Sequence, residues 1–409
     1  MTVPWLAVVG VGEDGEAGLS PAARTLIGAA RVVLGGKRLL ERVAALVPTT
    51  ADCVSWAGVE AAFEALEAHR GQQVVVLASG DPMFYGLGAT LTRRFAAAEM
   101  IVVPQASAFS LAAARLGWPL QEVETLSVHG RALETLAFHF APGVRLLVLS
   151  ENGETPGRVA ALLTAHGFGP SPMTVLEHMG GAAERQVTVR ADQWPGGTRT
   201  ADLNTLAIAC RADEGRQGWG RTPGLPDEAY LHDGQLTKRE IRAVTLAALA
   251  PRPGEMLWDI GAGAGSIAIE WLRTHPATLA VAVEQDTARL ATIAANAVRL
   301  GVPRLQGVLG CAPFCLAGLS APTAVFVGGG VSASGLLETC WAALPIGGRM
   351  VVNAVTIEAE ARLLAWQGTH GGTLTRLSVA RLRPMGRLRG WKPLAPVTQY
   401  QAMKTISAE

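Results

Sequence analysis

Three glycines between an apolar run and a helical pattern form the stretch of this sequence best suited to binding a small molecule. Residues 259–266 read Asp-Ile-Gly-Ala-Gly-Ala-Gly-Ser and follow an apolar run over 256–258. Because glycine permits positive φ angles and leaves the backbone open to a ligand, this pattern predicts a strand, a tight turn and a helix. The next apolar run ends at Glu284, about twenty residues downstream, where a carboxylate could accept hydrogen bonds from both hydroxyls of a ribose.

Two nucleoside cofactors fit such a loop, and the sequence favours one of them. A nicotinamide dinucleotide needs Gly-x-Gly-x-x-Gly, because its pyrophosphate lies at the helix N-terminus. Here Gly265 comes one residue early, Ser266 occupies the sixth position, and the charge of Asp259 would repel a pyrophosphate. S-adenosylmethionine (SAM) has no phosphate and carries a sulfonium and an ammonium, so an acidic residue before the loop suits it. We therefore expect SAM, with an NAD-linked reductase, a nucleic-acid methyltransferase and a non-catalytic SAM-binding protein as the alternatives.

The composition is that of a core-forming protein with two domains. The chain has 409 residues, 49% of them hydrophobic and 17% charged, and its formal net charge of +1 gives no indication of nucleic-acid binding. Its five cysteines lack Cys-x-x-Cys spacing and a nearby histidine pair, so we expect reduced thiols and no metal site. The N-terminus lacks a basic segment followed by an apolar one, and no apolar run approaches about eighteen residues. We therefore expect a cytoplasmic protein without a signal peptide or a membrane span.

In the first half, apolar strands alternate with helical patterns, and two of the strands run into glycine loops. Strand 5–9 leads into Gly10-Val-Gly12, and strand 73–78 leads into Ser79-Gly80-Asp81-Pro82. Strand–helix alternation predicts a largely parallel sheet, and ligands bind such sheets beyond the carboxyl ends of the strands. The glycines of both loops lie at those ends, and the aspartate of the second loop is open to two interpretations, a helix cap or a ligand contact.

The order of motifs over the first half resembles the tetrapyrrole (precorrin) methylase family. The motifs are the first glycine loop, Gly35-Gly36-Lys37-Arg38, Ser79-Gly80-Asp81-Pro82-Met83-Phe84-Tyr85-Gly86 and a Pro-x-x-Ser loop, and the stretches 33–39 and 112–118 are similar to the branch that methylates at C5. The resemblance implies two α/β lobes with SAM in the cleft between them. It implies SAM contacts at Gly80, Asp81, Pro82, Met83 and Ser107, and contacts to the macrocycle at Gly10 and Gly12.

Two loops depart from the family pattern. Where the family usually has Gly-x-Gly-Pro-Gly-Asp-Pro, this chain has Glu13-Asp14 in the middle of the loop. The usual Pro-Gly-x-Ser-Ser is replaced by Pro104-Gln105-Ala106-Ser107-Ala108.

Periodicity fails from about residue 212 to 232, where glycine, proline and charged residues are frequent. This composition predicts a linker over 212–232 between a first domain over 1–211 and a second domain over 233–409. We expect the second domain to begin with a helix capped by Thr237, with Glu240 completing a capping box. Its strand–helix alternation and two final apolar runs predict a Rossmann-like α/β domain with a seven-stranded sheet closed by a β-hairpin.

The second half resembles the decarboxylating precorrin methylases of cobalamin synthesis that act at C15. The resemblance rests on Thr-Lys-Arg-Glu-x-Arg from Thr237, the glycine loop, Glu284, Ala312-Pro313 and the stretch 352–358. It implies SAM contacts at Thr237, Gly261, Ala262, Gly263, Ala264, Gly265, Glu284 and Ala312.

Taken together, the two halves resemble fused enzymes in which each half transfers a methyl group from its own SAM. The resemblance implies methylation of a precorrin at C5 and C15, with loss of the C12 acetate as carbon dioxide (precorrin-6B to precorrin-8X). The sequence contains no evident Ser/His/Asp or Cys/His triad. Alignment with an already nucleophilic ring carbon can supply ~7–11 kcal/mol, so we assign no catalytic side chain.

The last part of the chain is basic. Residues 361–408 contain no Asp or Glu but include eight Lys and Arg residues, among them Arg383 and Arg387. A tetrapyrrole with several carboxylates needs such a rim, because arginine binds a carboxylate through two parallel hydrogen bonds. We therefore expect Arg383 and Arg387 to contact substrate, with a solvated hairpin face as the alternative. The resemblance also suggests a homo-oligomer formed through the C-terminal domain.

Overall fold

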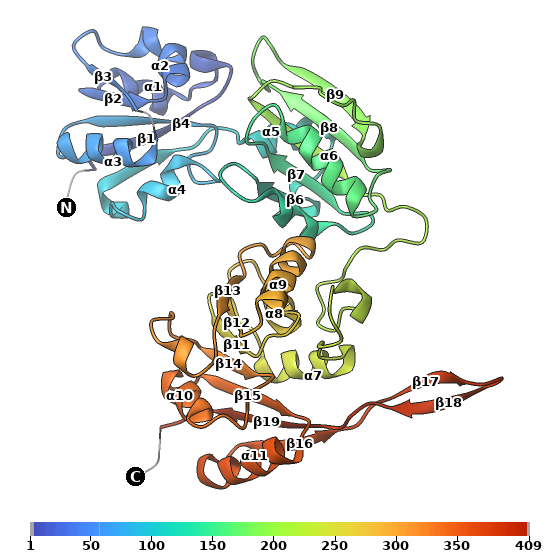
Figure 1. The fold of residues 1–409 in the computed structure, drawn as a ribbon. Helices are drawn as coiled ribbons and strands as arrows, with labels where there is room; N and C mark the ends of the chain where they lie inside the picture. Colours follow the sequence, from blue (N-terminus) through green and yellow to red (C-terminus); the bar gives the residue numbers. More distant parts are fainter. Residues whose placement is uncertain (1–3, 57, 407–409) are drawn as a thin grey trace. The chain divides into compact units, whose positions relative to one another are not determined.

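The computed structural model describes residues 4–56 and 58–406, which form two compact α/β units (Figure 1). The first unit comprises the chain up to Leu133 together with Phe140–Gln217, and the second comprises Glu134–His139 together with the chain from Gly218. The α/β fold class is therefore confirmed, and each unit is described below by itself.

The first unit begins with a five-stranded sheet that is parallel throughout. Its order is β3-β2-β4-β1-β5, and each pair along it runs in the same direction. Buried side chains cover both faces: Leu6 and Val8 of β1 point into one apolar cluster, and Ala7 and Val9 into another. The strands are β1 (Leu6–Val11), β2 (Val32–Gly35), β3 (Asp52–Ser55), β4 (Val74–Ser79) and β5 (Met100–Val103), with helices α1 (Pro21–Gly28), α2 (Lys37–Arg42), α3 (Val59–Ala68) and α4 (Leu87–Leu91).

The second sheet of the first unit is mostly antiparallel, which differs from the parallel arrangement predicted for this half. In the order β6-β7-β10-β8-β9, only β6 and β7 run in the same direction. The reason is the connection after β8: a short turn, not a crossover helix, returns the chain into β9, and only antiparallel strands can be joined so briefly. The elements are β6 (Glu124–Ser127), β7 (Arg145–Leu149), β8 (Pro172–Glu177), β9 (Arg185–Arg190) and β10 (Asn204–Ala209), with α5 (Ala108–Leu116) and α6 (Thr155–Ala165).

The second unit contains the predicted seven-stranded sheet. Its order is β13-β12-β11-β14-β15-β19-β16, with the first five strands parallel and the last two antiparallel. The strands are β11 (Met256–Ile260), β12 (Leu279–Glu284), β13 (Gln306–Leu309), β14 (Ala324–Val327), β15 (Arg349–Ala354), β16 (Thr373–Leu377) and β19 (Val397–Met403). The helices are α7 (Arg239–Leu249), α8 (Ser266–Thr274), α9 (Thr287–Arg299), α10 (Leu336–Ala343) and α11 (Ile357–His370).

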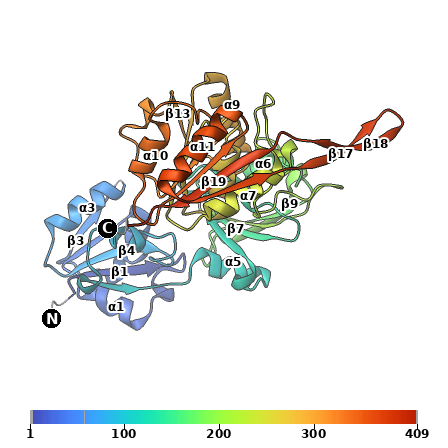
Figure 2. The same ribbon diagram turned by 90° about the horizontal axis from the view of Figure 1, so that it is seen from below.

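The chain between β16 and β19 continues beyond the seven-stranded sheet as a two-stranded hairpin. Strands β16 and β19 belong to the seven-stranded sheet, whereas β17 (Ala380–Met385) and β18 (Leu388–Pro393) pair only with each other. Figures 1 and 2 both show this two-stranded ribbon extending away from the sheet of its own unit. The ribbon exposes four large apolar side chains, those of Leu382, Met385, Leu388 and Trp391.

Part of the segment predicted as a linker is packed into the second unit. Leu225, Ala229 and Tyr230 are buried in one of its apolar clusters, and the segment includes the short 3-10 turn η7 (Asp227–Ala229). The carboxylate of Glu270 on α8 accepts hydrogen bonds from the backbone N–H groups of Gly224 and Leu225. Residues 218–232 therefore belong to the second unit by their contacts.

The predicted capping box at the start of α7 is wrong. The helix starts at Arg239, its N-cap residue is Lys238, and no side chain of that residue caps it. Instead, the carboxylate of Asp227 accepts a hydrogen bond from the N–H of Arg239 at 3.0 Å. Glu240 forms an ion pair with Arg381 at 2.6 Å, so it is not available to complete a box.

Candidate functional sites: a glycine-lined pocket and a two-sheet cleft

The pocket of the second unit lies at the carboxyl edge of its parallel strands. The ends of β11, β12 and β14 are in register, because Ile260 pairs with Val283 on one side and with Val327 on the other. The loops that leave these ends therefore meet at one edge, as is typical of ligand sites in parallel sheets. They surround a cavity of about 390 Å³, within the size range of small-molecule sites.

The glycine loop after β11 forms one wall, and two of its positions require glycine. Gly261 has φ +69°, and a Cβ there would lie 2.9 Å from the backbone nitrogen of Gly329. Gly263 has φ +58°, and a Cβ there would lie 3.2 Å from the carbonyl oxygen of Gln235. Side chains at these positions would fill the cavity and strain the backbone.

Glu284 provides the carboxylate expected at the end of β12. It is 5% exposed, and it accepts hydrogen bonds from the N–H groups of Gly263 (2.9 Å), Gln285 (2.9 Å) and Asp286 (3.1 Å). These bonds hold the carboxylate at the cavity wall, where lone pairs remain for further donors. The lining can thus hold a nucleoside whose ribose donates a hydrogen bond to Glu284.

Asp259, the acidic residue before the loop, is almost fully buried. One carboxylate oxygen accepts a hydrogen bond from the N–H of Ala268 at 3.0 Å, and the other has no partner among the described residues. Burial raises the pKa of Asp259 to about 7, with a smaller contribution from the charge of Glu284. This carboxyl group therefore lies under the loop with a pKa close to neutral pH.

Six of the residues predicted for this pocket line the cavity, and two do not. The six are Thr237, Gly261, Ala262, Gly263, Glu284 and Ala312. Ala264 is buried in the core, and Gly265 is the N-cap of α8, where a Cβ would lie 3.0 Å from Ile293. Both shape the turn from behind the lining.

The cavity is also lined by residues that sequence reasoning did not assign. They include Gln235, Cys311, Gly328, Gly329, Gly330 and Val355. The three glycines had a usable signal, because they follow β14 directly and so lie at the same sheet edge as the first loop. No feature of the sequence indicated Gln235, because its loop reaches the cavity only through the packing of residues 224–237.

The cleft of the first unit is built from both of its sheets. Gly12 and Gly80, which follow strands of the first sheet, lie across from Leu176 and Asn204 of the second sheet. Gly80 has φ +62°, and a Cβ at Gly10 would lie 2.1 Å from the carbonyl oxygen of Gly80. Gly12 and Gly80 therefore line the cleft, whereas Gly10 allows the two glycine loops to pack closely.

The other residues predicted for this cleft have visible local roles. The carboxylate of Asp81 accepts a hydrogen bond from the N–H of Met83 at 2.8 Å, which fixes the turn. Pro82 is buried, and Met83 is exposed. Ser107 is the N-cap of α5, since its Oγ accepts from the N–H of Ser110 at 3.0 Å. None of the four lines the cleft among the described residues, although Ala106 and Ala108, on either side of Ser107, do.

A buried acid at the first loop is the main feature of the cleft that sequence reasoning missed. Glu13 is 9% exposed and forms ion pairs with Arg38 and, at 2.6 Å, with Arg42, both on α2. Its Oε2 is also 3.4 Å from Nδ1 of His178, which follows β8. Both Glu13 and His178 line the cleft. The available signal was the departure of residues 13–14 from the family pattern.

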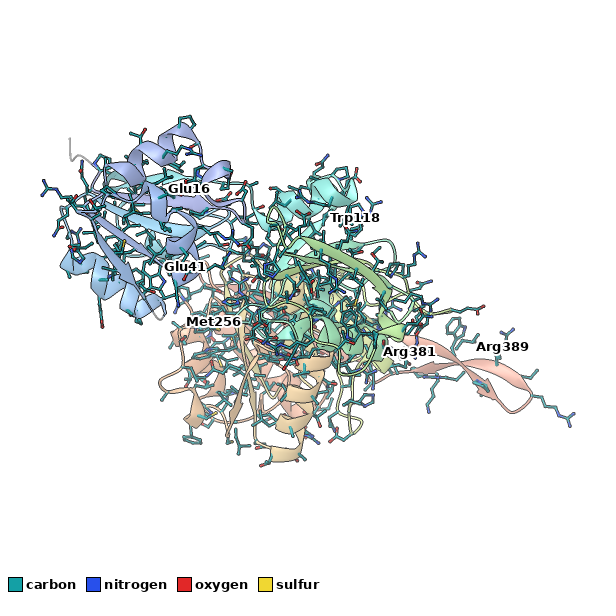
Figure 3. The ribbon with its side chains drawn as sticks, turned by 90° about the horizontal axis from the view of Figure 1, so that it is seen from above. Glu16, Glu41, Trp118, Met256, Arg381 and Arg389 are labelled. Carbon is teal, nitrogen blue, oxygen red and sulfur yellow. The ribbon has the colours of Figure 1, made fainter. Side chains whose placement is uncertain are left out.

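The described residues of the basic tail do not line the pocket of the second unit. Arg383 lies on β17 and Arg387 in the turn of the ribbon, and neither is among the described residues that line the cavity. Figure 3 labels Arg381 near the start of the ribbon and Arg389 farther along it. Several tail cations are paired within the unit: Arg362 with Glu338, Arg376 with Glu360, and Arg381 with Asp227 and Glu240.

Over 4–56 and 58–406, no three His, Cys, Asp or Glu side chains are grouped so that they could hold a metal ion. No helix within the same residues has the length and apolar character needed to cross a membrane.

Comparison with known proteins matches both halves of the chain. Residues 6–194 match the family model described as tetrapyrrole (corrin/porphyrin) methylases, and residues 228–404 match the precorrin methyltransferase domain. The crystal structure of the C-terminal domain of precorrin-6Y C5,15-methyltransferase from Rhodobacter capsulatus is 44% identical; the match covers 45% of this chain and 100% of that one, with a TM-score of 0.43.

Two curated relatives match over nearly their whole length. The precorrin-6Y C(5,15)-methyltransferase (decarboxylating) of Sinorhizobium sp is 49% identical over 402 residues, which cover 98% of this chain and 97% of the relative. The protein of the same name from Mycobacterium tuberculosis (strain CDC 1551 / Oshkosh) is 42% identical over 405 residues, covering 98% of this chain and 100% of the relative. The chain therefore belongs to the family of decarboxylating precorrin-6Y C(5,15)-methyltransferases.

Proposed function

We propose that this chain methylates a precorrin at C5 and at C15 with SAM and removes the C12 acetate as carbon dioxide, converting precorrin-6B to precorrin-8X in cobalamin biosynthesis. The observation that carries the proposal is the presence of two separate glycine-lined sites in one chain of this family, one in each unit. Two methylations at different carbons require the macrocycle to be presented twice. Two sites on two different folds meet that requirement.

We assign C5 methylation to residues 1–211, and C15 methylation with decarboxylation to residues 233–409, with one SAM in each. The second site is supported by its lining, which includes Thr237, Gly261–Gly263, Glu284 and Ala312. The first is supported by Gly12 and Gly80 at the cleft, with Asp81, Pro82, Met83 and Ser107 shaping the adjoining turns. Gly10 acts by allowing these loops to pack. Arg383 and Arg387 stay assigned to the carboxylates of the substrate, as cations on an exposed ribbon.

The residues of both sites bind SAM and the macrocycle and align the reacting atoms. When bound, SAM supplies an electrophilic methyl group. Glu284 is held by three backbone N–H groups, so it can accept from a ribose without reorganising. The glycine loop leaves room for the nucleoside against bare backbone, and the ring carbon is already nucleophilic. Alignment can then supply most of the acceleration.

The proposal is tested by incubating the full chain with SAM and the C5,C15-unmethylated precorrin, and following the products by mass spectrometry. The expected products have gained two methyl groups and lost one carbon dioxide, with S-adenosylhomocysteine formed only when tetrapyrrole is present. Binding of NADH in place of SAM, or formation of S-adenosylhomocysteine with nucleic acid instead, would overturn it.

We also propose a homo-oligomer formed through residues 233–409. The support is the ribbon β17–β18, which exposes Leu382 (46%), Met385 (66%), Leu388 (76%) and Trp391 (72%). Exposed apolar side chains on a protruding element are typical of an interaction surface. Sedimentation of the full chain should show an oligomer that Trp391→Lys dissociates, while Leu364→Lys, at an exposed apolar position on α11, serves as the control. A monomeric wild-type chain would contradict the proposal.

A cytoplasmic location is part of the same proposal. All five cysteines are free thiols, of which Cys53 and Cys311 are exposed. Exposed free thiols are typical of proteins kept in a reducing compartment. Fractionation of cells that produce the chain tests this, and recovery in a secreted or membrane fraction would contradict it.

A further inference from the structure

The two proposed methylations differ in what happens to the proton that each one releases. At either carbon, the methyl group arrives without an electron pair. The electron pair of the C–H bond therefore stays in the ring to restore the double bond, and the hydrogen leaves as a proton. At C15, loss of carbon dioxide leaves an electron pair on the side-chain carbon, and that carbon takes up one proton. The C15 reaction is balanced without a base that retains a proton, whereas the C5 reaction must pass one proton to the protein or to solvent.

The cleft of the first unit contains a side chain suited to this task. We propose that His178 is the base that accepts the C5 proton, and that Glu13 is the residue that positions it. His178 lines the cleft together with Gly12 and Gly80, and its side chain is 34% exposed, so it is open to a bound ring. The proposal rests on the assignment of C5 methylation to this unit.

The contact with Glu13 determines which nitrogen of His178 is available. Nδ1 of His178 lies 3.4 Å from Oε2 of Glu13. A carboxylate can only accept a hydrogen bond, so Nδ1 carries the hydrogen and Nε2 is left with the free lone pair. An imidazole oriented by a carboxylate in this way is the usual arrangement of a histidine that takes up a proton.

The carboxylate is itself held in place by cations. The side chain of Glu13 is 7% exposed, and Arg38 and Arg42 form ion pairs with it from the same helix. Arg42 also donates to the backbone carbonyl of Glu13. These contacts prevent Glu13 from rotating out of the cleft, so His178 meets a fixed acceptor.

The backbone at His178 is held in an uncommon conformation. Its φ is +46°, and among the described residues only Tyr85 and Ala250 share a positive φ without being glycine. The conformation is enforced on both sides, because the N–H of His178 donates to Leu203 at 3.2 Å and its carbonyl accepts from Gly181 at 2.9 Å. Strained conformations of this kind persist where the surrounding structure demands them, and they cluster at functional sites.

The corresponding pocket of the second unit has no such pair. Among the described residues its lining contains no histidine, and its carboxylate, Glu284, accepts from three backbone N–H groups and is the group assigned to the ribose. This difference agrees with the proton balance, because only the C5 reaction releases a proton that no other step of the reaction takes up.

The test uses the full chain with His178→Asn, since asparagine tolerates a positive φ and the substitution therefore preserves the turn. C5 methylation should slow by about 100-fold or more, as expected for loss of a general base. C15 methylation, measured in the same reaction by mass spectrometry, should change by less than about twofold, since its site is in the other unit. His69→Gln, which alters a histidine away from the cleft, is the matched control.

Three readouts separate a base from a residue that only shapes the cleft. A substrate deuterated at C5 should show a primary isotope effect in His178→Asn, where proton removal becomes rate-limiting, and a smaller one in the wild type. Calorimetry should give an unchanged affinity for S-adenosylhomocysteine. Added imidazole should partly restore C5 methylation in His178→Ala.

The positioning role of Glu13 has its own test. Glu13→Gln should lower kcat for C5 methylation and alter its pH profile. Arg38 and Arg42 are the other charged groups that contact Glu13.

Two outcomes would overturn the inference, and they are distinguishable from failure of the proposed function. C5 methylation at the wild-type rate in His178→Asn, with C15 methylation normal, would exclude His178 as the base. Slowed C5 methylation with a weakened S-adenosylhomocysteine affinity and no isotope effect would assign it a binding role instead. A wild-type chain that methylates neither carbon would overturn the proposed function itself, and this inference with it.

Discussion

The two units solve the same binding problem in different ways. In the second unit, the loops after β11, β12 and β14 meet at one sheet edge because their strands are in register, and the segment 234–237 before α7 adds a further wall to the pocket. In the first unit, two sheets share the cleft, and the space between them is smaller, about 60 Å³ against about 390 Å³. A pocket on one rigid sheet edge is formed before the ligand arrives, whereas a cleft between two sheets depends on their spacing. We therefore expect the first unit to adjust more on binding.

The sharpest way to test this comparison is to close each site separately. Gly263→Val should abolish C15 methylation and leave C5 methylation intact, and Gly80→Val should do the reverse. Both glycines have φ near +60°, and at both a Cβ would lie 3.2 Å from a backbone carbonyl oxygen. Mass spectrometry of the product measures both reactions. Gly254→Ala and Gly143→Ala, with positive φ but open space around the Cβ, serve as controls. Loss of both methylations in either single variant would show that the two sites are not independent.

The second test concerns the buried ion network that holds one wall of the preformed pocket. Arg242 is fully buried and bonds to Glu270 at 2.9 Å, to Asp227 at 2.9 Å and to the carbonyl oxygen of Thr237, which lines the cavity. Arg242→Met should destabilise the second unit by about 3–5 kcal/mol, because it leaves a buried carboxylate unpaired. Urea unfolding of the full chain, followed by hydrogen exchange in each unit, measures this.

The matched control for that network is the double variant Arg242→Met, Glu270→Gln, which removes both charges but keeps an amide oxygen that can accept from the backbone N–H groups of residues 224 and 225. It should recover part of the lost stability, since removing both charges of a buried pair is less costly than leaving one charge unpaired. Equal destabilisation of the first unit by Arg242→Met would contradict the conclusion that each site is stabilised by its own unit.

The third test uses the buried acid beneath the glycine loop. Burial raises the pKa of Asp259 to about 7 in the folded state from its ordinary value of 3.8. The folded state therefore retains a proton that the unfolded chain loses, so this contribution to stability is present at low pH and falls as the pH rises towards 7. Relative to Asp259→Asn, the wild type should lose about 2–3 kcal/mol between pH 5 and pH 8. Denaturant unfolding at the two pH values measures the difference, and a pH-independent difference would show that Asp259 titrates normally.

The smallest expected effect is at Glu284, the carboxylate proposed to bind the ribose hydroxyls. Glu284→Gln should weaken binding of S-adenosylhomocysteine to the second unit by about 1.5–3 kcal/mol, roughly 10- to 150-fold, since the acceptor of the ribose hydrogen bond loses its charge. Calorimetry of the full chain should show one weakened site and one unchanged site. Glu338→Gln, at an exposed ion pair on α10, is the control. A weakening of both sites would mean that the ligand contacts were assigned to the wrong unit.

The sequence alone determined the strands, the glycine loops and the α/β fold class. These features are local: an apolar run of suitable length forms a strand, and glycine permits a turn of positive φ, whatever the rest of the chain does. Glu284 was found the same way, since its place at the end of a strand is a matter of spacing. The seven-stranded sheet also followed from the order of its elements.

Only the tertiary structure decided which distant residues meet. Glu13 and His178 are 165 positions apart, and nothing in either local sequence specifies their contact. Asp227, and not Thr237, accepts a hydrogen bond from the backbone at the start of α7. Glu270 anchors a segment that was predicted to be a linker, because the buried backbone N–H groups of that segment need an acceptor. The position of Arg383 and Arg387 outside the pocket lining also depends on tertiary structure. The sequence gives their charge, but the extent of the ribbon decides where that charge lies.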